Sequence, residues 1–328
     1  MQNKTIHIVI LTFCLFSYLS YLTACSDSSL ISNSSSYLES SSKYGKDVIV
    51  SFSYSSYDNG CCKVRTSQGD YPYPEQPYDA IEELTFPSYS PENERVISAC
   101  IENSFESLKT IHLPSSIINI PQEAFKCLGN LQNINITASV KRIGTEAFCD
   151  DVALPEINLP KVKVICERAF QNCASLSYVD LGDSLIDIQE SAFSGCSILS
   201  SLSFPTTLKE IGYHAFEKDT SLKSVTIPGN TKRIGNYAFF RCDSLKFLTI
   251  QDGVESIGAC AFEDTSIEKV FLPKTVTELG KDAITNQKGH TTVYCEAASK
   301  PEGYDLDGYQ KSNVTYVFGV TRQEFEKL

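Results

Sequence analysis

The chain of 328 residues is poor in several residue types on which common protein chemistries depend. It has no tryptophan, one methionine and four histidines, and its 28 basic residues are outnumbered by 40 acidic ones, giving a net charge of −12 at pH 7. This balance argues against nucleic acid as a partner and against electrostatic attachment to an anionic membrane. Because Cys-x-x-Cys spacing is also absent, the sequence does not support a zinc site.

The usual sequence signatures of catalysis are missing as well. There is no G-x-S-x-G turn, no phosphate-binding P-loop and no glycine pattern for a dinucleotide. His112, His214 and His290 stand far apart along the chain, whereas a nucleophile, a histidine and a carboxylate must lie within hydrogen-bond reach. We therefore expect no enzyme, no cofactor and no metal, although the sequence leaves open a pair of carboxylates for glycoside hydrolysis.

What the chain has in abundance is a repeated unit that ends in alanine and phenylalanine. Weaker copies stand at Ser104-Phe105 and Ala283-Ile284, and the successive gaps are 20, 23, 22, 23, 23, 23, 23 and 22 residues. The full copies are Ala124-Phe125, Ala147-Phe148, Ala169-Phe170, Ala192-Phe193, Ala215-Phe216, Ala238-Phe239 and Ala261-Phe262. A fixed period in this range is typical of a solenoid of stacked coils.

One unit, Ser221–Phe239, shows how such a coil is built. Apolar residues alternate around Thr226, which is the period of a half-buried strand. Pro228 ends the strand, because proline has no N–H to donate, and Gly235 is expected in a turn that needs positive φ. Since no single coil of this size buries its apolar face, neighbouring coils must stack and bury their phenylalanines against each other.

The repeated pattern S-L-x-x-[IVL]-x-[IVLF]-P-x-x-[VIL]-x-x-I-G-x-x-A-F-x-x-C resembles the BspA-like leucine-rich repeat of bacterial and some protozoal surface proteins. The resemblance covers roughly Ile81 to Ile284. It implies an α/β repeat solenoid, a leucine-rich-repeat-like curved slab with a parallel sheet on its concave face and about nine coils of 22–23 residues. Some coils depart from the pattern: Pro121, Cys166 and Gln189 replace the glycine, and Asp219 and Thr265 replace the cysteine.

Residues 1–24 are predicted to be a lipoprotein-type signal peptide, with Lys4 ahead of the hydrophobic run Ile6–Leu22. The run ends in Leu22-Thr23-Ala24-Cys25, which resembles the lipobox of bacterial lipoproteins. That resemblance implies cleavage before Cys25, lipidation of its thiol and a protein anchored by lipid at the outer membrane, the cell surface or in the periplasm. An ordinary signal peptide cleaved after Ala24, or an uncleaved anchor, is the alternative.

The rest of the chain divides into four predicted segments. Residues 25–60 are a Ser-rich tether, 61–105 an N-terminal cap with a degenerate repeat, 106–284 the solenoid and 285–328 a C-terminal cap. Strands are expected at Val48–Tyr54, Thr291–Cys295 and Asn313–Phe318. Thr321 and Glu324 have the spacing of a capping box, which predicts a short terminal helix within 321–328.

Three of the 13 cysteines, Cys173, Cys196 and Cys242, stand three residues after a repeat phenylalanine. We expect them to be buried thiols that act as small apolar side chains. Disulfides are the alternative, because an exported chain meets an oxidising compartment and stacked coils bring equivalent residues to ~5 Å.

The predicted sheet also presents two rows of outward side chains, one before and one after the first buried residue of each strand. The first row is Thr110, Asn133, Glu156, Tyr178, Ser201, Ser224, Phe247 and Lys269, and the second is His112, Asn135, Asn158, Asp180, Ser203, Thr226, Thr249 and Phe271. Most of these side chains are polar and uncharged. We predict a ligand-binding face centred on Tyr178, Phe247 and Phe271 with Thr226 and Thr249, because exposed aromatics are typical anchors. The alternative is a solvated sheet that uses these residues for strand propensity alone.

The family resemblance implies a function for this face, because its members are linked to binding of host extracellular-matrix and plasma proteins and to attachment between cells. We therefore expect a lipid-anchored surface or periplasmic protein that mediates adhesion or protein–protein interaction. A glycan-binding or scaffold lipoprotein that uses the same face is the alternative, since a fold does not fix a function.

Overall fold

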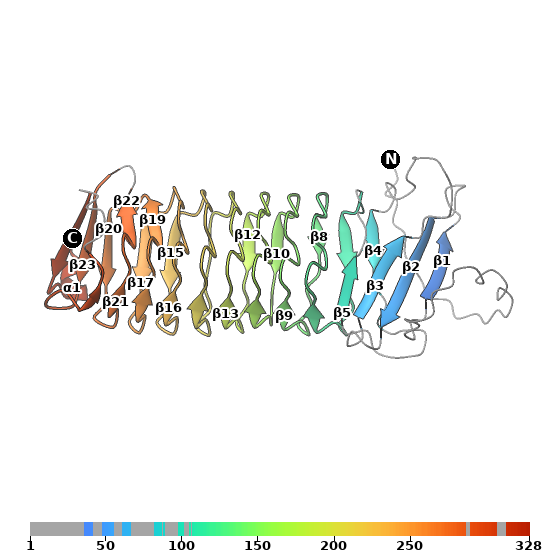
Figure 1. The fold of residues 1–328 in the computed structure, drawn as a ribbon, viewed down its shortest axis with the longest axis horizontal. Helices are drawn as coiled ribbons and strands as arrows, with labels where there is room; N and C mark the ends of the chain where they lie inside the picture. Colours follow the sequence, from blue (N-terminus) through green and yellow to red (C-terminus); the bar gives the residue numbers. More distant parts are fainter. Residues whose placement is uncertain are drawn as a thin grey trace, which may run out of the picture.

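The computed structural model describes the backbone of the strands at 36–41, 48–55 and 61–66, together with residues 82–86, 88, 98–101, 105, 107–286, 289–306 and 313–328. Its coils stand side by side in a single row, and the row runs nearly straight in the view of Figure 1. Within the described residues, no helix has the length and apolar character needed to cross a membrane. Cys25 and the predicted signal peptide lie outside the described residues, so lipidation stays a prediction.

The strands predicted in the repeat form four short groups along one side of the coils, and neighbours within each group are parallel. The groups are β4 (Glu83–Thr85), β6 (Thr110–His112) and β8 (Asn133–Ile134); β10 (Glu156–Asn158) and β12 (Tyr178–Asp180); β15 (Ser224–Ile227) and β17 (Phe247–Ile250); and β20 (Lys269–Leu272), β23 (Thr291–Cys295) and β25 (Val314–Phe318). We call the outward side chains of these strands, and of the intervening Ser201–Ser203, the strand face.

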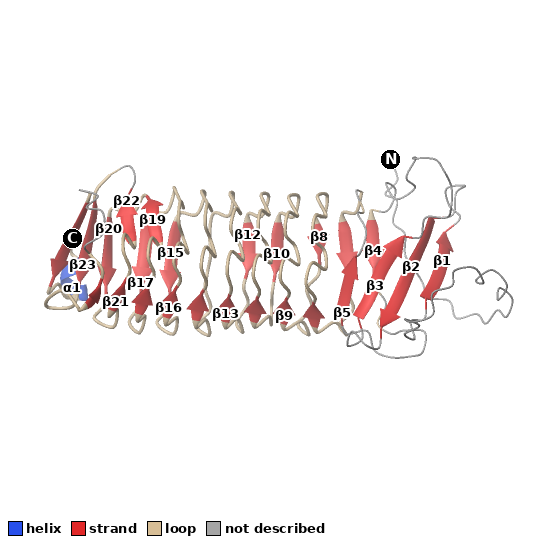
Figure 2. Cartoon of the chain, in the orientation of Figure 1, coloured by secondary structure: helices blue, strands red, loops and turns tan. Residues whose placement is uncertain are grey.

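A second sheet, which the sequence pattern did not reveal, runs along another side of the coils (Figure 2). Its 13 strands are β1 (Ser36–Ser41), β2 (Val48–Ser55), β3 (Cys61–Thr66), β5 (Ser98–Ile101), β7 (Asn119–Ile120), β9 (Arg142–Ile143), β11 (Val164–Ile165), β13 (Asp187–Ile188), β14 (Glu210–Ile211), β16 (Arg233–Ile234), β18 (Ser256–Ile257), β21 (Glu278–Leu279) and β24 (Gly303–Tyr304). We call it the long sheet. A separate pair, β19 (Phe262–Thr265) and β22 (Ile284–Asn286), lies near the C-terminal end.

The ends of the chain contain the expected strands. Strand β2 covers the predicted segment Val48–Tyr54, and β23 and β25 match the two predicted C-terminal strands. Strands β1 and β2 fall within the segment predicted as a tether, and β1–β2–β3 pair antiparallel before β3 joins the long sheet in parallel with β5. The domain boundaries themselves stay a prediction.

The helical part of the expected α/β architecture is small. Among the described residues the one helix is α1 (Arg322–Phe325), and turns stand where the repeats of an α/β solenoid would carry a helix. The predicted capping box of α1 is present: Thr321 Oγ1 accepts from the Glu324 N–H, and the Glu324 carboxylate accepts from the Thr321 N–H at 2.8 Å. The repeat therefore folds as a parallel β-solenoid.

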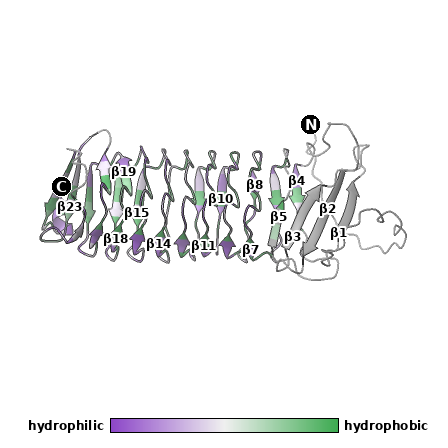
Figure 3. Ribbon diagram, viewed as in Figure 1, coloured by the Kyte–Doolittle hydropathy of each residue, from purple (hydrophilic) through white to green (hydrophobic). Residues whose placement is uncertain are grey.

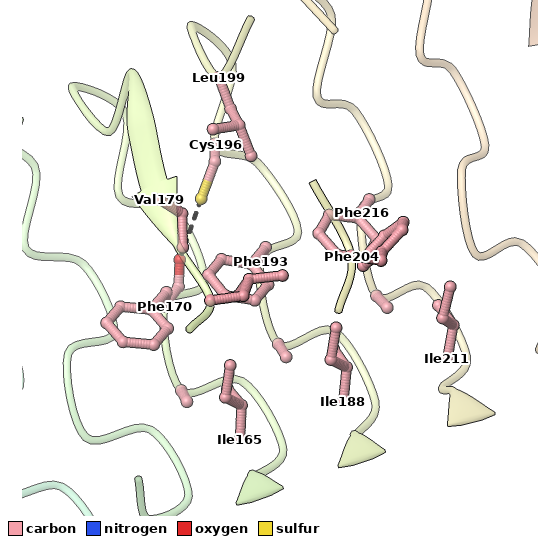
Figure 4. Packing of buried hydrophobic residues seen from close by; sticks show 14 of the residues in the cluster. Ile165, Phe170, Val179, Ile188, Phe193, Cys196, Leu199, Phe204, Ile211 and Phe216 are labelled. Atoms are coloured by element: carbon pink, nitrogen blue, oxygen red, sulfur yellow. Dashed lines mark hydrogen bonds between the residues drawn. The ribbon is translucent and has the colours of Figure 1, made fainter. Parts of the chain in front are cut away.

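The repeat phenylalanines form a continuous stack along the axis of the solenoid. From Phe148 to Phe262, neighbouring ring centroids lie 5.0–5.3 Å apart, with interplanar angles of 9° or less. Figure 4 shows Phe170, Phe193 and Phe216 in this stack, with the isoleucines of the long sheet packed beside them. All these rings are fully buried, so the aromatic stack is the centre of the hydrophobic core.

The role expected for the repeat glycine was wrong in one respect. Gly235 does not have positive φ; in its coil, Tyr237 (φ 58°) and Arg241 (φ 58°) adopt the left-handed conformation instead. Glycine is required because the previous coil passes so close. A Cβ on Gly235 would lie 2.6 Å from the backbone carbon of Gly212 and 2.7 Å from the nitrogen of Tyr213.

The predicted burial of the repeat cysteines is correct, and the eight cysteines whose side chains are described are free thiols. The Cys196 thiol donates to the carbonyl of Phe170 (3.3 Å), and the Cys242 thiol donates to the carbonyl of Phe216 (3.2 Å). Burial raises the pKa of both thiols well above the ordinary value, so both are protonated and unreactive at neutral pH.

Aspartate occupies the same place in two coils. Asp219 takes the place of the repeat cysteine in the coil between those of Cys196 and Cys242, and it is fully buried. Burial raises the pKa of its carboxyl well above the ordinary range. Asp151 accepts from the Leu128 N–H (2.7 Å), yet burial raises its pKa to about 9. Burial therefore disfavours the ionised form of both carboxyls in the folded protein.

Candidate functional site

The strand face presents polar side chains around two exposed aromatic rings. Along β10, β12, β15 and β17, buried residues alternate with more exposed ones. Figure 3 shows that hydrophilic and hydrophobic residues both occur along the coils. Tyr178 is 52% exposed and Phe247 is 70% exposed. They occupy the same position in coils three steps apart, which is ~14 Å at the ~4.8 Å spacing of neighbouring strands. Both rings are thus available to a partner that spans the intervening coils.

The polar residues predicted for this site lie where expected. Thr226 pairs with Thr249 in the parallel register of β15 and β17, and both side chains are exposed. Ser224 is the register partner of Phe247, so a serine stands beside that residue in the preceding coil. Hydroxyls that both donate and accept can follow the polar groups of a bound chain while an aromatic ring buries apolar area.

The exposure predicted for Phe271 was wrong. Its side chain is only 3% exposed, because α1 covers it. The Phe325 ring lies 5.5 Å from the Phe271 ring, and the Arg322 guanidinium stands 4.6 Å above the same ring. Phe271 is therefore part of the C-terminal closure of the solenoid and is not available to a ligand while α1 is in place.

The helix is held on the strand face by contacts far apart in sequence. Arg322 Nη2 donates to the carbonyl of Ile250 (3.2 Å) and lies 3.5 Å from the Asp252 carboxylate. Phe325 also packs against Tyr294 (5.4 Å), and the Lys269 ammonium stands 5.7 Å from its ring. Because of these contacts, α1 covers the strand face on the C-terminal side of Phe247. The sequence analysis missed this contact; the three-residue spacing of Arg322 and Phe325, which puts both on one side of a helix, is the signal that could have indicated it.

The histidines have separate partners in separate parts of the solenoid. His112 Nε2 lies 2.5 Å from Glu83 Oε1, and His214 Nδ1 lies 2.7 Å from Glu217 Oε2. His290 Nε2 contacts Thr315 Oγ1 at 2.9 Å. Within the described part of the chain, no group of three or more metal-ligating side chains forms a metal site. The arrangement is one of isolated pairs, and we assign none of them a catalytic role.

Comparison with known proteins agrees with this architecture. The family described as BspA type Leucine rich repeat region matches residues 78–186 and 163–291, in six copies. The chain belongs to this family. The match ends at residue 291 and stops short of α1, so the helix that covers Phe271 lies outside the matched repeats. No curated protein matches the sequence.

Solved structures of other leucine-rich-repeat proteins are similar to this BspA-type protein. A leucine-rich repeat protein from Bacteroides ovatus is 22% identical over 84% of this chain and 78% of its own, with a TM-score of 0.55, which supports the fold. A leucine rich cell surface protein from Faecalibacterium prausnitzii is 14% identical over 88% and 97% of the two chains, with a TM-score of 0.43. A T. pallidum Leucine Rich Repeat protein is 23% identical over 70% and 83%, with a TM-score of 0.42.

Proposed function

We propose that this BspA-type repeat protein is a lipid-anchored binding protein that recognises a protein partner through its strand face. The observation that carries the proposal is the pair of exposed rings, Tyr178 and Phe247, on an ordered and mostly uncharged sheet. Large aromatic side chains held by a rigid scaffold lose little conformational entropy on binding and bury much apolar area. A row of coils offers such anchors on one continuous surface.

The proposed anchor is the lipidated thiol of Cys25. Its support is the sequence Leu22-Thr23-Ala24-Cys25 after a hydrophobic run, with a Ser-rich segment following at once. Several acyl chains on one cysteine hold a protein on a membrane stably, because each buried CH₂ contributes ~0.8 kcal/mol. We place the protein at the outer membrane, the cell surface or in the periplasm.

The partner we propose is a neutral or basic protein, such as a host extracellular-matrix or plasma protein. The chain's net charge of −12 favours approach of a partner without excess negative charge. A glycan would use the same rings and hydroxyls, and a partner lipoprotein would make this chain a scaffold. We propose no catalytic function.

A binding panel separates these possibilities. The soluble chain of residues 26–328 is tested against immobilised matrix and plasma proteins and, in parallel, on a glycan array. Saturable binding to a protein, with no glycan bound at comparable concentration, supports the proposal. Binding to glycans alone would replace it with the glycan-binding alternative.

A further inference from the structure

The long sheet lies on a different side of the coils from the strand face (Figure 1), and a row of mostly basic residues stands just before its strands. The residue immediately before each short strand stacks on its counterpart in the next coil. Backbone hydrogen bonds of 2.8 Å connect Lys141, Lys163, Ile186, Lys209 and Lys232 in this order, each N–H donating to the carbonyl of the previous member. Four of five consecutive coils thus carry lysine at one position. We call these five residues the lysine row.

The charges at the centre of the row are available. All four lysines are exposed, and Lys163 and Lys209 form no ion pair with any residue that the structure describes. At the ends of the row the lysines have partners within the protein. Lys141 Nζ donates to the Ala138 carbonyl (2.8 Å), and Lys232 Nζ lies 2.7 Å from Glu255 Oε1.

The neighbouring column of the same sheet does not cancel this charge. It consists of Arg142, Val164, Asp187, Glu210 and Arg233. Arg233 already pairs with Glu210 at 2.9 Å, and the half-buried Asp187 accepts from the Gln189 side chain (3.1 Å). The two columns from β9 to β16 together hold six basic and two acidic residues in a chain of net charge −12.

Like charges stand in neighbouring coils within this row, although the same coils also pair opposite charges. Lys163 follows Lys141, and Lys232 follows Lys209, at the ~4.8 Å spacing of neighbouring strands. Like charges in adjacent register positions destabilise a sheet, whereas the Arg233–Glu210 and Lys232–Glu255 pairs show the stabilising arrangement that the same coils provide. An anion lying along the row would relieve that repulsion.

We propose that the lysine row binds one linear chain of a sulfated polysaccharide. The row spans ~19 Å, four strand spacings, and is a single residue wide. A thin chain can follow it, whereas a nucleic-acid duplex or a bilayer would also approach the rest of a chain whose net charge is −12. Lysine ammonium groups suit sulfates as point charges that need no bidentate geometry. Ile186, 41% exposed in the middle of the row, offers apolar contact to the C–H face of a sugar ring.

The test uses dextran sulfate as the probe and unsulfated dextran as the reference, with the full protein immobilised at low salt. We expect saturable binding to dextran sulfate alone, which weakens as salt rises. Lys163→Gln with Lys209→Gln should lower the affinity at least about tenfold. The matched control is Lys223→Gln with Lys246→Gln, which removes the same charge from two exposed lysines in adjacent coils just before β15 and β17.

The proposal is overturned if dextran sulfate does not bind, or if the test and control lysine variants lose affinity for it equally. It is also overturned if duplex DNA or phosphatidylserine vesicles bind as tightly as dextran sulfate, with the same dependence on Lys163 and Lys209. Unchanged melting temperatures show that the exposed substitutions leave the fold intact. Replacing Tyr178 and Phe247 should leave dextran sulfate binding unaltered, because this site is separate from the strand face. Failure here and failure of the proposed protein-binding function are therefore distinguishable.

Discussion

The ring of Phe325 in α1 lies over the ring of Phe271 in β20, with 5.5 Å between their centroids. This contact converts an outward strand position into a buried one and closes the C-terminal end of the strand face. We expect Phe325→Ala to expose Phe271 and to increase binding of a hydrophobic dye such as ANS. The matched control is Leu328→Ala, which removes an exposed side chain at the end of the chain and should leave dye binding unchanged. Equal dye binding by both variants would show that α1 does not shield the ring.

The aromatic stack predicts a large loss of stability when one ring is removed. Phe193 and Phe216 are fully buried with centroids 5.3 Å apart. Phe193→Ala or Phe216→Ala should lower the free energy of unfolding by ~3–5 kcal/mol, from lost apolar burial and the cavity that remains. Urea unfolding measures the change, with Phe247→Ala as the exposed control. A loss below ~1 kcal/mol for the buried rings would contradict their position in the core.

The close approach of neighbouring coils predicts different results for two glycines. A methyl group on Gly235 would collide with the backbone of Gly212, whereas one on Gly129 meets no atom within 4 Å. Gly235→Ala should therefore destabilise the protein by ~1–3 kcal/mol, the usual cost of overpacking. Gly129→Ala should be neutral or slightly stabilising, because it restricts the unfolded chain. Similar melting temperatures for the two variants would mean that the coils can separate to admit a side chain.

Burial of Asp219 predicts a pH dependence of stability. The pKa of this carboxyl is raised in the folded protein, so the folded state keeps a proton that the unfolded state releases above about pH 4. Its contribution to the free energy of unfolding must then fall as the pH rises. Asp219→Asn removes this contribution, so the variant should gain stability relative to wild type between pH 4.5 and pH 8.

Urea unfolding at pH 4.5, 6 and 8 measures the effect of Asp219→Asn. The exposed Asp305→Asn serves as the control, since its carboxyl lies in water in both states. A constant difference between Asp219→Asn and wild type across this range would show that the carboxyl is ionised inside the fold.

Much of this fold follows from the repeat period. The regular Ala-Phe spacing predicted stacked coils, and Phe193 and Phe216 stack as expected. Thr321 and Glu324 predicted the capped helix because a capping box is a local signal. The long sheet was missed, since strands of two residues are too short to show an alternating pattern.

Other contacts between coils could not be predicted from the sequence. The need for glycine at position 235 comes from the backbone of Gly212 in the previous coil, which no local pattern reveals. The burial of Phe271 likewise depends on Arg322, whose guanidinium reaches the Ile250 carbonyl 72 positions away along the chain. For the strand face, the pattern correctly gave the exposure of Tyr178 and Phe247, because the alternation of a strand is local.

The most direct test of the proposed function is the affinity of a Tyr178→Ser with Phe247→Ser variant for the matrix or plasma protein bound in the panel. The control variant, Tyr213→Ser with Val152→Ser, removes two exposed apolar side chains away from the strand face. We predict that the strand-face variant loses at least about tenfold in affinity at an unchanged melting temperature, while the control binds as wild type does. Unaltered binding by the strand-face variant, or an equal loss in the control, would contradict recognition through this face.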